Sequence, residues 1–207
     1  MFITFEGGEG SGKSTVIKEI AKRIADSGRE VVLTREPGGT PIGEEIRNVI
    51  LEKKNTAMDP RTEALLYAAS RRQHLVEKII PALKEGKIVI SDRFLDSSLA
   101  YQGMARGLGM AEVYQLNLFA TEGFEPDLTI YLSLDPEAGI ERIEANPNRE
   151  VNRLDLEKIS FHELVHKGFE ELTKENPHRI VKVDASKSVD QVIEACWEAV
   201  EKRLRWR

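Results

Sequence analysis

Residues 7–14 read Gly-Gly-Glu-Gly-Ser-Gly-Lys-Ser, which completes the pattern G-x-x-x-x-G-K-[ST] of a phosphate-binding loop. An apolar run at residues 1–5 precedes this loop, and a segment with apolar residues at helical spacing follows it. The glycines allow successive backbone N–H groups to surround a phosphate, and the N-terminus of the helix adds partial positive charge. This context predicts a nucleotide site. The residues expected to hold the phosphates are Gly7, Gly8, Glu9, Gly10, Ser11, Gly12, Lys13, Ser14 and Thr15.

Two side chains of the loop and two at the end of a later strand carry the predicted chemistry. Lys13 can reach the β- and γ-phosphates of a bound triphosphate, and the hydroxyl of Ser14 can ligate magnesium. Asp92 and Arg93 follow the apolar run 88–91, at the end of a strand where open α/β sheets form their sites. We expect Asp92 on the magnesium side and Arg93 on the transferring phosphoryl group. The alternative is a solvated Asp-Arg pair.

Apolar runs and helical patterns alternate along the whole chain, which is typical of a parallel sheet with helices on both faces. We expect five strands, at residues 2–5, 31–34, 88–91, 128–134 and 179–183. We expect helices at residues 13–26, 42–52, 61–84, 111–122, 136–144, 154–175 and 188–203. Pro81 should bend or end the third helix, and the polar stretch 146–153 predicts a mobile loop. The expected fold is one α/β domain over residues 1–207.

Composition narrows the class of protein further. The chain has 207 residues and a net charge of −5, which argues against a nucleic-acid partner. Its apolar runs are shorter than the ~20 residues needed to span a bilayer, and the first strand leaves no room for a signal peptide. The single cysteine, Cys196, excludes an internal disulfide and falls in an apolar helical stripe, so we expect a buried thiol. These features favour a cytoplasmic protein with no membrane partner.

Two other classes of protein deserve comparison. Residues 162–166 form a formal H-E-x-x-H motif, the zinc-protease signature, but no downstream segment clearly supplies a third metal ligand. Apolar residues at helical spacing, such as Phe161 and Val165, explain this segment as an amphipathic helix. A GTP-dependent switch would carry Asp-x-x-Gly and Asn-Lys-x-Asp motifs, and neither occurs in the sequence. A nucleotide-binding switch therefore stays a weaker alternative.

The third predicted helix carries a candidate for base recognition. Tyr67 and Arg71 are four residues apart and share one helix face, where a ring and a guanidinium can hold a nucleobase. Surface packing is the alternative for such a pair. Residues 96–103 add hydroxyl, ring and amide groups that can contact a nucleoside. The turn after the second strand places Arg35 and Glu36 at the same rim of the sheet as the phosphate-binding loop.

Four segments occur in the order found in thymidylate kinases, and the chain resembles that family over essentially its whole length. They are Gly-Gly-Glu-Gly-Ser-Gly-Lys-Ser-Thr (7–15), Arg-Glu-Pro-Gly-Gly-Thr (35–40), Ala-Ala-Ser-Arg-Arg (68–72) and Asp-Arg-Phe-Leu-Asp-Ser-Ser-Leu-Ala-Tyr-Gln-Gly (92–103). The resemblance implies phosphorylation of dTMP to dTDP with ATP and magnesium. It also implies a nucleoside monophosphate kinase fold with a short lid at about residues 144–155, and a homodimer. Another deoxynucleoside monophosphate as substrate is the nearest alternative.

The resemblance also assigns roles to single positions around an acceptor nucleotide. Glu9 is implied to meet the 3′-hydroxyl of deoxyribose, and Tyr101 to crowd the 2′ position and so favour deoxynucleotides. Tyr67 takes the place of the ring that stacks on thymine, which is usually Phe in the family. The other substrate-binding positions are Arg35, Arg47 and Arg93 around the acceptor phosphate, Glu36 beside them at the rim, and Arg71, Gln102 and Ser98 at the base edge.

The position after Glu9 distinguishes two kinds of thymidylate kinase. Some members have a catalytic arginine there, whereas this chain has Gly10. The resemblance to the bacterial type implies that arginines of the lid contact the phosphates instead. We expect Arg149 and Arg153 to act in this way, together with Lys13 and Arg93. Arg142 lies in the preceding helical pattern and stays open, and residues 183–186 take the place of the loop that packs on adenine.

Overall fold

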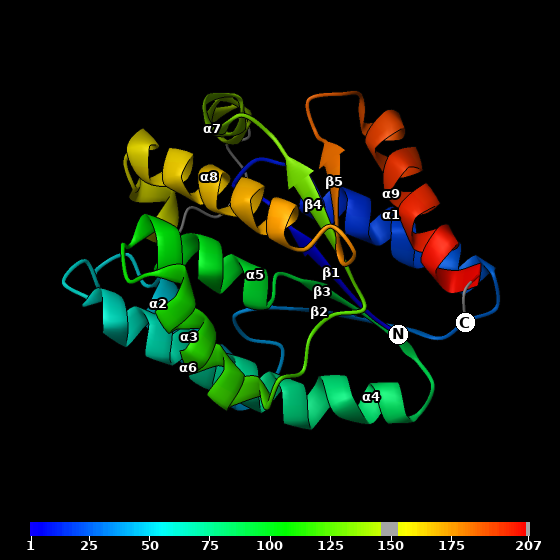
Figure 1. Ribbon diagram of the computed structural model, residues 1–207, viewed down its shortest axis with the longest axis horizontal. Coiled ribbons are helices and arrows are strands. Elements are labelled where there is room, and N and C mark those ends of the chain that lie inside the picture. Colours follow the sequence, from blue (N-terminus) through cyan, green and yellow to red (C-terminus); the bar gives the residue numbers. More distant parts are fainter. Residues whose placement is uncertain (146–152, 206–207) are drawn as a thin grey trace.

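The computed structural model describes residues 1–145 and 153–205 (Figure 1). In this part of the chain, five parallel strands form one sheet in the order β2-β3-β1-β4-β5. The strands are β1 (Phe2–Glu6), β2 (Val31–Arg35), β3 (Ile88–Asp92), β4 (Leu128–Ser133) and β5 (Ile180–Asp184). Each predicted strand boundary lies within one residue of the observed one. The predicted fold class, a five-stranded parallel sheet with helices on both faces, is confirmed.

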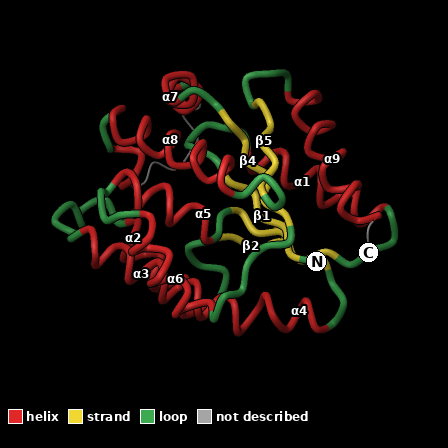
Figure 2. The backbone as a smooth tube through the Cα atoms, viewed as in Figure 1, coloured by secondary structure: helices red, strands yellow, loops and turns green. Residues whose placement is uncertain are grey.

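Helices cover both faces of the sheet, and the strands lie between them (Figure 2). One face is covered by α1 (Lys13–Asp26) and α9 (Val189–Arg205). The opposite side of the molecule holds α2 (Pro41–Leu51), α3 (Pro60–His74), η1 (Leu75–Ile79), α4 (Ile80–Lys84), α5 (Leu95–Ser98), η2 (Leu99–Ala105), α6 (Met110–Thr121) and α8 (Ile159–Glu175). The helix α7 (Pro136–Glu144) and the short 3-10 helix η3 (Arg153–Leu156) border the segment outside the described residues.

The central strand β1 explains how a buried sheet delivers polar groups to its carboxyl end. Its side chains alternate, so that Ile3 and Phe5 belong to the core under α1 and α9. Thr4 and Glu6 are also fully buried, but their alternate positions place them on the opposite face. There the hydroxyls of Thr4 and Thr129 lie 2.8 Å apart. Buried polar groups need such partners, so this face carries a hydrogen-bonded layer directly beneath the loop at residues 7–12.

The third predicted helix, residues 61–84, is continuous in space but changes its geometry. α3 passes into the π-helical turn η1, and α4 then ends at Lys84. Pro81 lacks an N–H group, and its ring would clash with the carbonyl one α-helical turn earlier. A wider π turn immediately before Pro81 makes room for this ring. The proline therefore changes the helix before it rather than ending it there.

Two other helix predictions differ from the structure. The predicted helix at 154–175 is divided into η3 and α8, because Lys158 has extended backbone with ψ 156° and begins a new helix. The pair α5 and η2 was not predicted as helical. Gly103 within η2 lies so close to α6 that a Cβ there would be 2.9 Å from the Cα of Met110. This close approach explains a glycine inside a helix.

Among the helices that the structure describes, none combines the length and the apolar character that a membrane crossing requires.

Candidate active site

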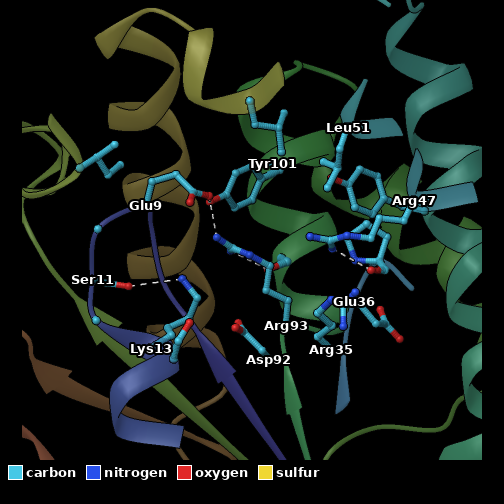
Figure 3. A pocket seen from close by; sticks show the side chains of 18 of the residues that line it. Glu9, Ser11, Lys13, Arg35, Glu36, Arg47, Leu51, Asp92, Arg93 and Tyr101 are labelled. Carbon is cyan, nitrogen blue, oxygen red and sulfur yellow. Dashed lines mark hydrogen bonds and ion pairs between the residues drawn. The ribbon is translucent and has the colours of Figure 1, made fainter. Parts of the chain in front are cut away.

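A cavity of about 850 Å³ lies beyond the carboxyl ends of β1, β2 and β3. It is bounded on one side by residues 9–15 of the phosphate-binding loop and on the other by residues of α2. In Figure 3, Glu9 and Lys13 enter from the loop side, Arg35, Glu36 and Arg47 lie opposite, and Arg93 stands between the two groups. The elements expected to form one site therefore meet around one space.

Glycine is required by the course of the loop at Gly10. This residue has a φ of +72°, and a Cβ there would lie 2.2 Å from the carbonyl oxygen of Gly139 in α7. A larger residue at this position, including an arginine, would need both a strained backbone and movement of α7. The structure therefore gives a physical reason why the position after Glu9 carries no side chain.

Lys13 is folded back over the loop. Its Nζ donates to the carbonyl oxygens of Gly7 at 3.0 Å and Gly8 at 3.1 Å, and to Oγ of Ser11 at 3.4 Å. The pKa of Lys13 is lowered to about 8, mainly because the ammonium group is buried and secondly because Arg93 carries a positive charge nearby. The loop thus holds the Lys13 ammonium group against neutral oxygens, beside the space into which a phosphate would fit.

Arg93 lies between the phosphate-binding loop and Tyr101. Its guanidinium donates to the carbonyl oxygen of Gly7 at 2.9 Å and pairs with the Glu9 carboxylate at 2.7 Å. It also lies over the ring of Tyr101, 5.0 Å from the centroid. The φ of Arg93 is +71°, which few residues other than glycine adopt. Such strain is found at functional positions, where surrounding contacts hold the backbone in place.

Tyr101 and Glu9 line the same cavity as Arg93. The hydroxyl of Tyr101 donates to Oε1 of Glu9 at 3.1 Å, the same oxygen that Arg93 contacts. Burial raises the pKa of Tyr101 well above its ordinary value, so the hydroxyl stays protonated and can donate. The three side chains therefore form one hydrogen-bonded cluster that faces the cavity.

The oxygen atoms of Asp92 and Ser14 fit a hydrated divalent cation. Oδ1 of Asp92 is buried and has no hydrogen-bond partner among the described residues. An acceptor oxygen in that state suits a water bound to Mg²⁺, and Ser14 lies in the same cavity wall. The part of the chain that the structure describes holds no cluster of three or more metal-ligating side chains. Phosphate oxygens and water would therefore complete the coordination of such an ion.

The wall opposite the loop holds the predicted acceptor residues. Arg35, Glu36, Arg47 and Tyr67 all line the cavity. Arg47 is oriented by the carbonyl oxygen of Pro37 at 2.9 Å, and Arg35 by the Glu44 carboxylate at 3.0 Å. The two arginines thus contribute positive charge at the end of the cavity away from Lys13.

The comparisons with known proteins agree with this arrangement. The family model described as thymidylate kinase matches residues 5–196. The chain belongs to the thymidylate kinase family. It is 58% identical to a thymidylate kinase of Clostridium novyi over 93% of this chain and 94% of that protein. It is 57% identical to one of Bacillus licheniformis over 99% of this chain and 97% of that protein. The solved structure of thymidylate kinase from Ehrlichia chaffeensis matches with a TM-score of 0.79 and 34% identity, covering 97% of this chain and 98% of that one.

The expected base-edge residues of this thymidylate kinase family member lie at different depths. Gln102 and Arg71 are each 1% exposed and Ser98 is 2% exposed, but Gln102 lines the cavity, whereas Arg71 and Ser98 lie in the layer behind its wall. The guanidinium of Arg71 donates to Glu36 at 2.8 Å, to Ser98 at 2.9 Å and to the carbonyl oxygen of Phe94 at 2.9 Å, and also contacts Asn117. Most of its donors are thus already used within the protein.

The arginines predicted in and around the lid differ in position: one lies outside the described residues, one is buried and one lines the cavity. Arg149 and most of the predicted lid lie outside the described residues. Arg153 is buried, with Nε 2.9 Å from the carbonyl oxygen of Ile50 and its guanidinium paired with Glu63. Arg142 lines the cavity and donates to the carbonyl oxygen of Ala185 at 3.1 Å, which brings it next to the segment 183–186.

Sequence reasoning missed Glu63, which is 1% exposed and collects several donors around the cavity wall. Its position four residues before Tyr67 was the available signal, since such residues share a helix face. It also missed Ser97, which lines the cavity and accepts from Arg93 at 3.2 Å.

The H-E-x-x-H segment and the single cysteine both take part in packing and hydrogen bonding within the protein. His166 lies 3.1 Å from the hydroxyl of Tyr131 and 3.8 Å from Glu170, and the described residues form no metal cluster there. Cys196 is buried in the core, as expected, and burial raises its pKa to about 12. A thiol with that pKa is a poor nucleophile.

Proposed function

We propose that this chain transfers the γ-phosphoryl group of ATP to dTMP, giving ADP and dTDP. The observation that carries the proposal is the cavity itself, where a phosphate-binding loop with Lys13 faces Arg47 across Arg93. Membership of the thymidylate kinase family makes the chain a phosphotransferase and supports dTMP as the acceptor. A switch that only binds nucleotide has no use for the side chains that line the cavity opposite the loop, such as Arg47 and Tyr67.

The donor half of the cavity would hold the triphosphate through backbone and charge. In the proposal the N–H groups of the loop and Lys13 bind the β- and γ-phosphates, with Lys13 moving from the loop carbonyls to the phosphate. Ser14 and Asp92 would hold Mg²⁺. When bound, that ion neutralises charge on the phosphate oxygens. ATP would restore full protonation of Lys13, because nearby negative charge raises the pKa of an amine.

The acceptor half would place the dTMP phosphate between Arg47 and Arg93, with Arg35 at the rim. That phosphate is already a nucleophile, so the proposal includes no general base. Glu9 would accept from the 3′-hydroxyl, while Tyr101 blocks the 2′ side and Tyr67 stacks on the base. Catalysis then consists of alignment and of charge stabilisation by Arg93, which stands between the two groups of side chains (Figure 3).

The lid completes the proposal. We propose that residues 1–207 form one domain and that a lid at about residues 144–155 closes over the cavity and excludes water. Arg149 would then contact the phosphates. For Arg153 the same role would require its side chain to leave Glu63. A cytoplasmic location, where ATP is available, belongs to the same proposal.

We also propose that two copies pair through α3 and α6. These helices pack against each other on the outside of the molecule (Figure 1) and carry exposed apolar side chains. Phe119 is 87% exposed, and Leu65 is 56% exposed. Exposed apolar residues gathered on neighbouring helices are typical of an interface. A homodimer with twofold symmetry would cover both side chains.

A coupled ADP-release assay tests the proposed function. The acceptors to compare are dTMP, dUMP, dCMP, dGMP and AMP, each with ATP and magnesium. We expect the highest kcat/KM with dTMP and some use of dUMP, since a single methyl group is worth only about 1–3 kcal/mol. Preference for another acceptor would overturn the substrate assignment. Tight GTP binding without any acceptor would favour a switch.

A further inference from the structure

Glu63 in α3 occupies a central position behind the cavity wall. Its side chain is 1% exposed and accepts hydrogen bonds from two neighbouring elements. From η2 and the residue after it, Gln102 donates at 2.8 Å and Arg106 donates to both carboxylate oxygens at 3.2 Å. From η3, Arg153 pairs with the same carboxylate. Of these partners, Gln102 is the one that lines the cavity.

The carboxylate of Glu63 is held in its ionised form. Burial opposes ionisation, but hydrogen bonds from Arg106, Gln102 and Arg153 outweigh it and lower the pKa of Glu63 below its ordinary value. An ionised carboxylate only accepts hydrogen bonds. Every group that faces Glu63 must therefore present a donor.

This requirement fixes the amide of Gln102. Its Nε2 lies 2.8 Å from Oε1 of Glu63. If the amide turned by 180°, its own Oε1 would meet the carboxylate oxygen, and two acceptors would face each other inside the protein. Glu63 therefore selects one of the two orientations that an isolated glutamine side chain can adopt.

The selected orientation leaves Oε1 of Gln102 for a molecule in the cavity. None of the described residues donates a hydrogen bond to this oxygen, and it is not among their fully buried, unpaired polar atoms. Since Gln102 lines the cavity, Oε1 can accept from a ligand there. The remaining hydrogen on Nε2 can donate to an adjacent acceptor.

We propose that Glu63 is a positioning residue that sets base specificity, by holding Gln102 so that its amide oxygen accepts from a base N–H in the acceptor pocket. The proposal rests on the proposed function and deepens it. Thymine presents N3–H beside the acceptor O4, which matches the held amide. Cytosine presents an acceptor N3 beside an amino group, which only the reversed amide would match.

The most direct test compares dTMP with 5-methyl-dCMP. The two nucleotides share the sugar, phosphate and methyl group and differ only along the base edge. Glu63→Gln keeps the size of the side chain, but its amide can donate as well as accept, so Gln102 becomes free to turn. We expect the kcat/KM ratio of dTMP to 5-methyl-dCMP to fall by about tenfold or more, the scale of one mispaired buried polar group.

A matched control uses another partner of the same carboxylate. Arg106→Met removes a donor to Glu63 but leaves the contact between Glu63 and Gln102. It should keep the dTMP to 5-methyl-dCMP ratio within about twofold of the wild-type value, even where both rate constants fall. A general loss of packing lowers both constants together, so the ratio separates a positioning role from a structural one.

Glu63→Asp provides a second variant if Glu63→Gln does not fold, because it withdraws the carboxylate by one methylene and should also lower the ratio. The wild type gives a further measurement by NMR, with Gln102→Leu used to identify the side-chain amide signal of Gln102. One amide proton should exchange slowly with solvent, and rapid exchange of both would overturn the inference. An unchanged ratio in a folded Glu63 variant would also overturn it. If the wild-type protein showed no preference for dTMP over the other acceptors, that result would instead overturn the proposed function.

Discussion

At the scale of single residues, Lys13 and Arg93 are two cations that both donate hydrogen bonds to the phosphate-binding loop. Arg93 is held by Gly7 and Glu9, and Ser97 accepts from it on the side of the sheet. Ser97 in turn donates to Glu6, the last residue of β1. Arg93 is thus supported from the buried polar layer beneath the loop. Among the described residues, Lys13 donates its hydrogen bonds to oxygens of the loop, and in the proposed function it exchanges these oxygens for phosphate.

Replacement of Lys13 tests its proposed role in phosphoryl transfer. Lys13→Ala removes a point charge that the loop places on the transferring phosphate, and turnover should fall by a factor on the order of 10² or more. Lys18→Ala, an exposed lysine on the same helix, should leave turnover unchanged. The measurement is kcat with circular dichroism as a check of folding. Near-normal turnover in folded Lys13→Ala would show that the loop is not catalytic.

The buried carboxyl of Glu6 predicts a dependence of stability on pH. Burial, and next the charge of Asp96, raise the pKa of Glu6 to about 8, while Arg93 acts in the opposite direction. A raised pKa means that the folded state binds the proton more tightly, so the contribution to stability is complete below the unfolded pKa of about 4.5. It is lost as the pH rises through about 8.

Glu6→Gln should therefore lose less free energy of unfolding than the wild type between pH 5 and pH 8. Urea unfolding at several pH values measures the difference. Asp96, whose negative charge contributes to the raised pKa of Glu6, is itself paired with Arg179 at 2.7 Å. Parallel curves for the two proteins would mean that Glu6 is ionised throughout.

At the scale of elements, the sequence allows the strands to be predicted better than the helices. Apolar runs bounded by polar or glycine residues mark strand ends closely. The break at Lys158 is missed because apolar residues on both sides of it continue a helical spacing. The π turn η2 escapes prediction because it follows no 3.6-residue period. The loop residues of the site follow from their motif, whereas the contacts of Arg71 with Phe94 and Asn117 depend on distant segments.

The short helix η3 gives the clearest prediction at this scale. Arg153 anchors η3 to α2 and α3 through Ile50 and Glu63, so Arg153→Ala should cost about 1–3 kcal/mol of stability. Arg149→Ala should lower kcat more than it raises KM for dTMP, with little change in stability. Urea unfolding and steady-state kinetics on both variants provide the comparison. Full stability of Arg153→Ala would remove its role as an anchor.

At the scale of the whole molecule, the predicted site residues that the structure describes lie at or next to the cavity beyond the carboxyl ends of the strands. β1 and β3 end at the phosphate-binding loop and at Arg93, and the helices on the second face supply Arg47, Tyr67 and Gln102. The face formed by α3 and α6 points away from the sheet and keeps its apolar residues exposed. In the proposed dimer, α3 would therefore line the cavity with one face and contribute to the interface with another.

Phe119 tests the proposed assembly. Phe119→Glu should convert a dimer into a monomer, because the twofold contact would bring two carboxylates together in an apolar interface. Leu164→Glu, which changes an exposed leucine on α8, should leave the dimer intact. Sedimentation equilibrium on the two variants and the wild type gives the masses. A wild-type monomer at every concentration would exclude this interface.

Transfer of label from γ-³²P-ATP shows directly whether the γ-phosphoryl group passes to dTMP, to water or to another acceptor. With dTMP and magnesium, the label should appear in dTDP, and little should appear as inorganic phosphate because the acceptor excludes water from the cavity. Without dTMP the label should stay in ATP. Release of the label mainly as inorganic phosphate would contradict this reaction. Formation of another labelled nucleotide with no labelled dTDP would also contradict it.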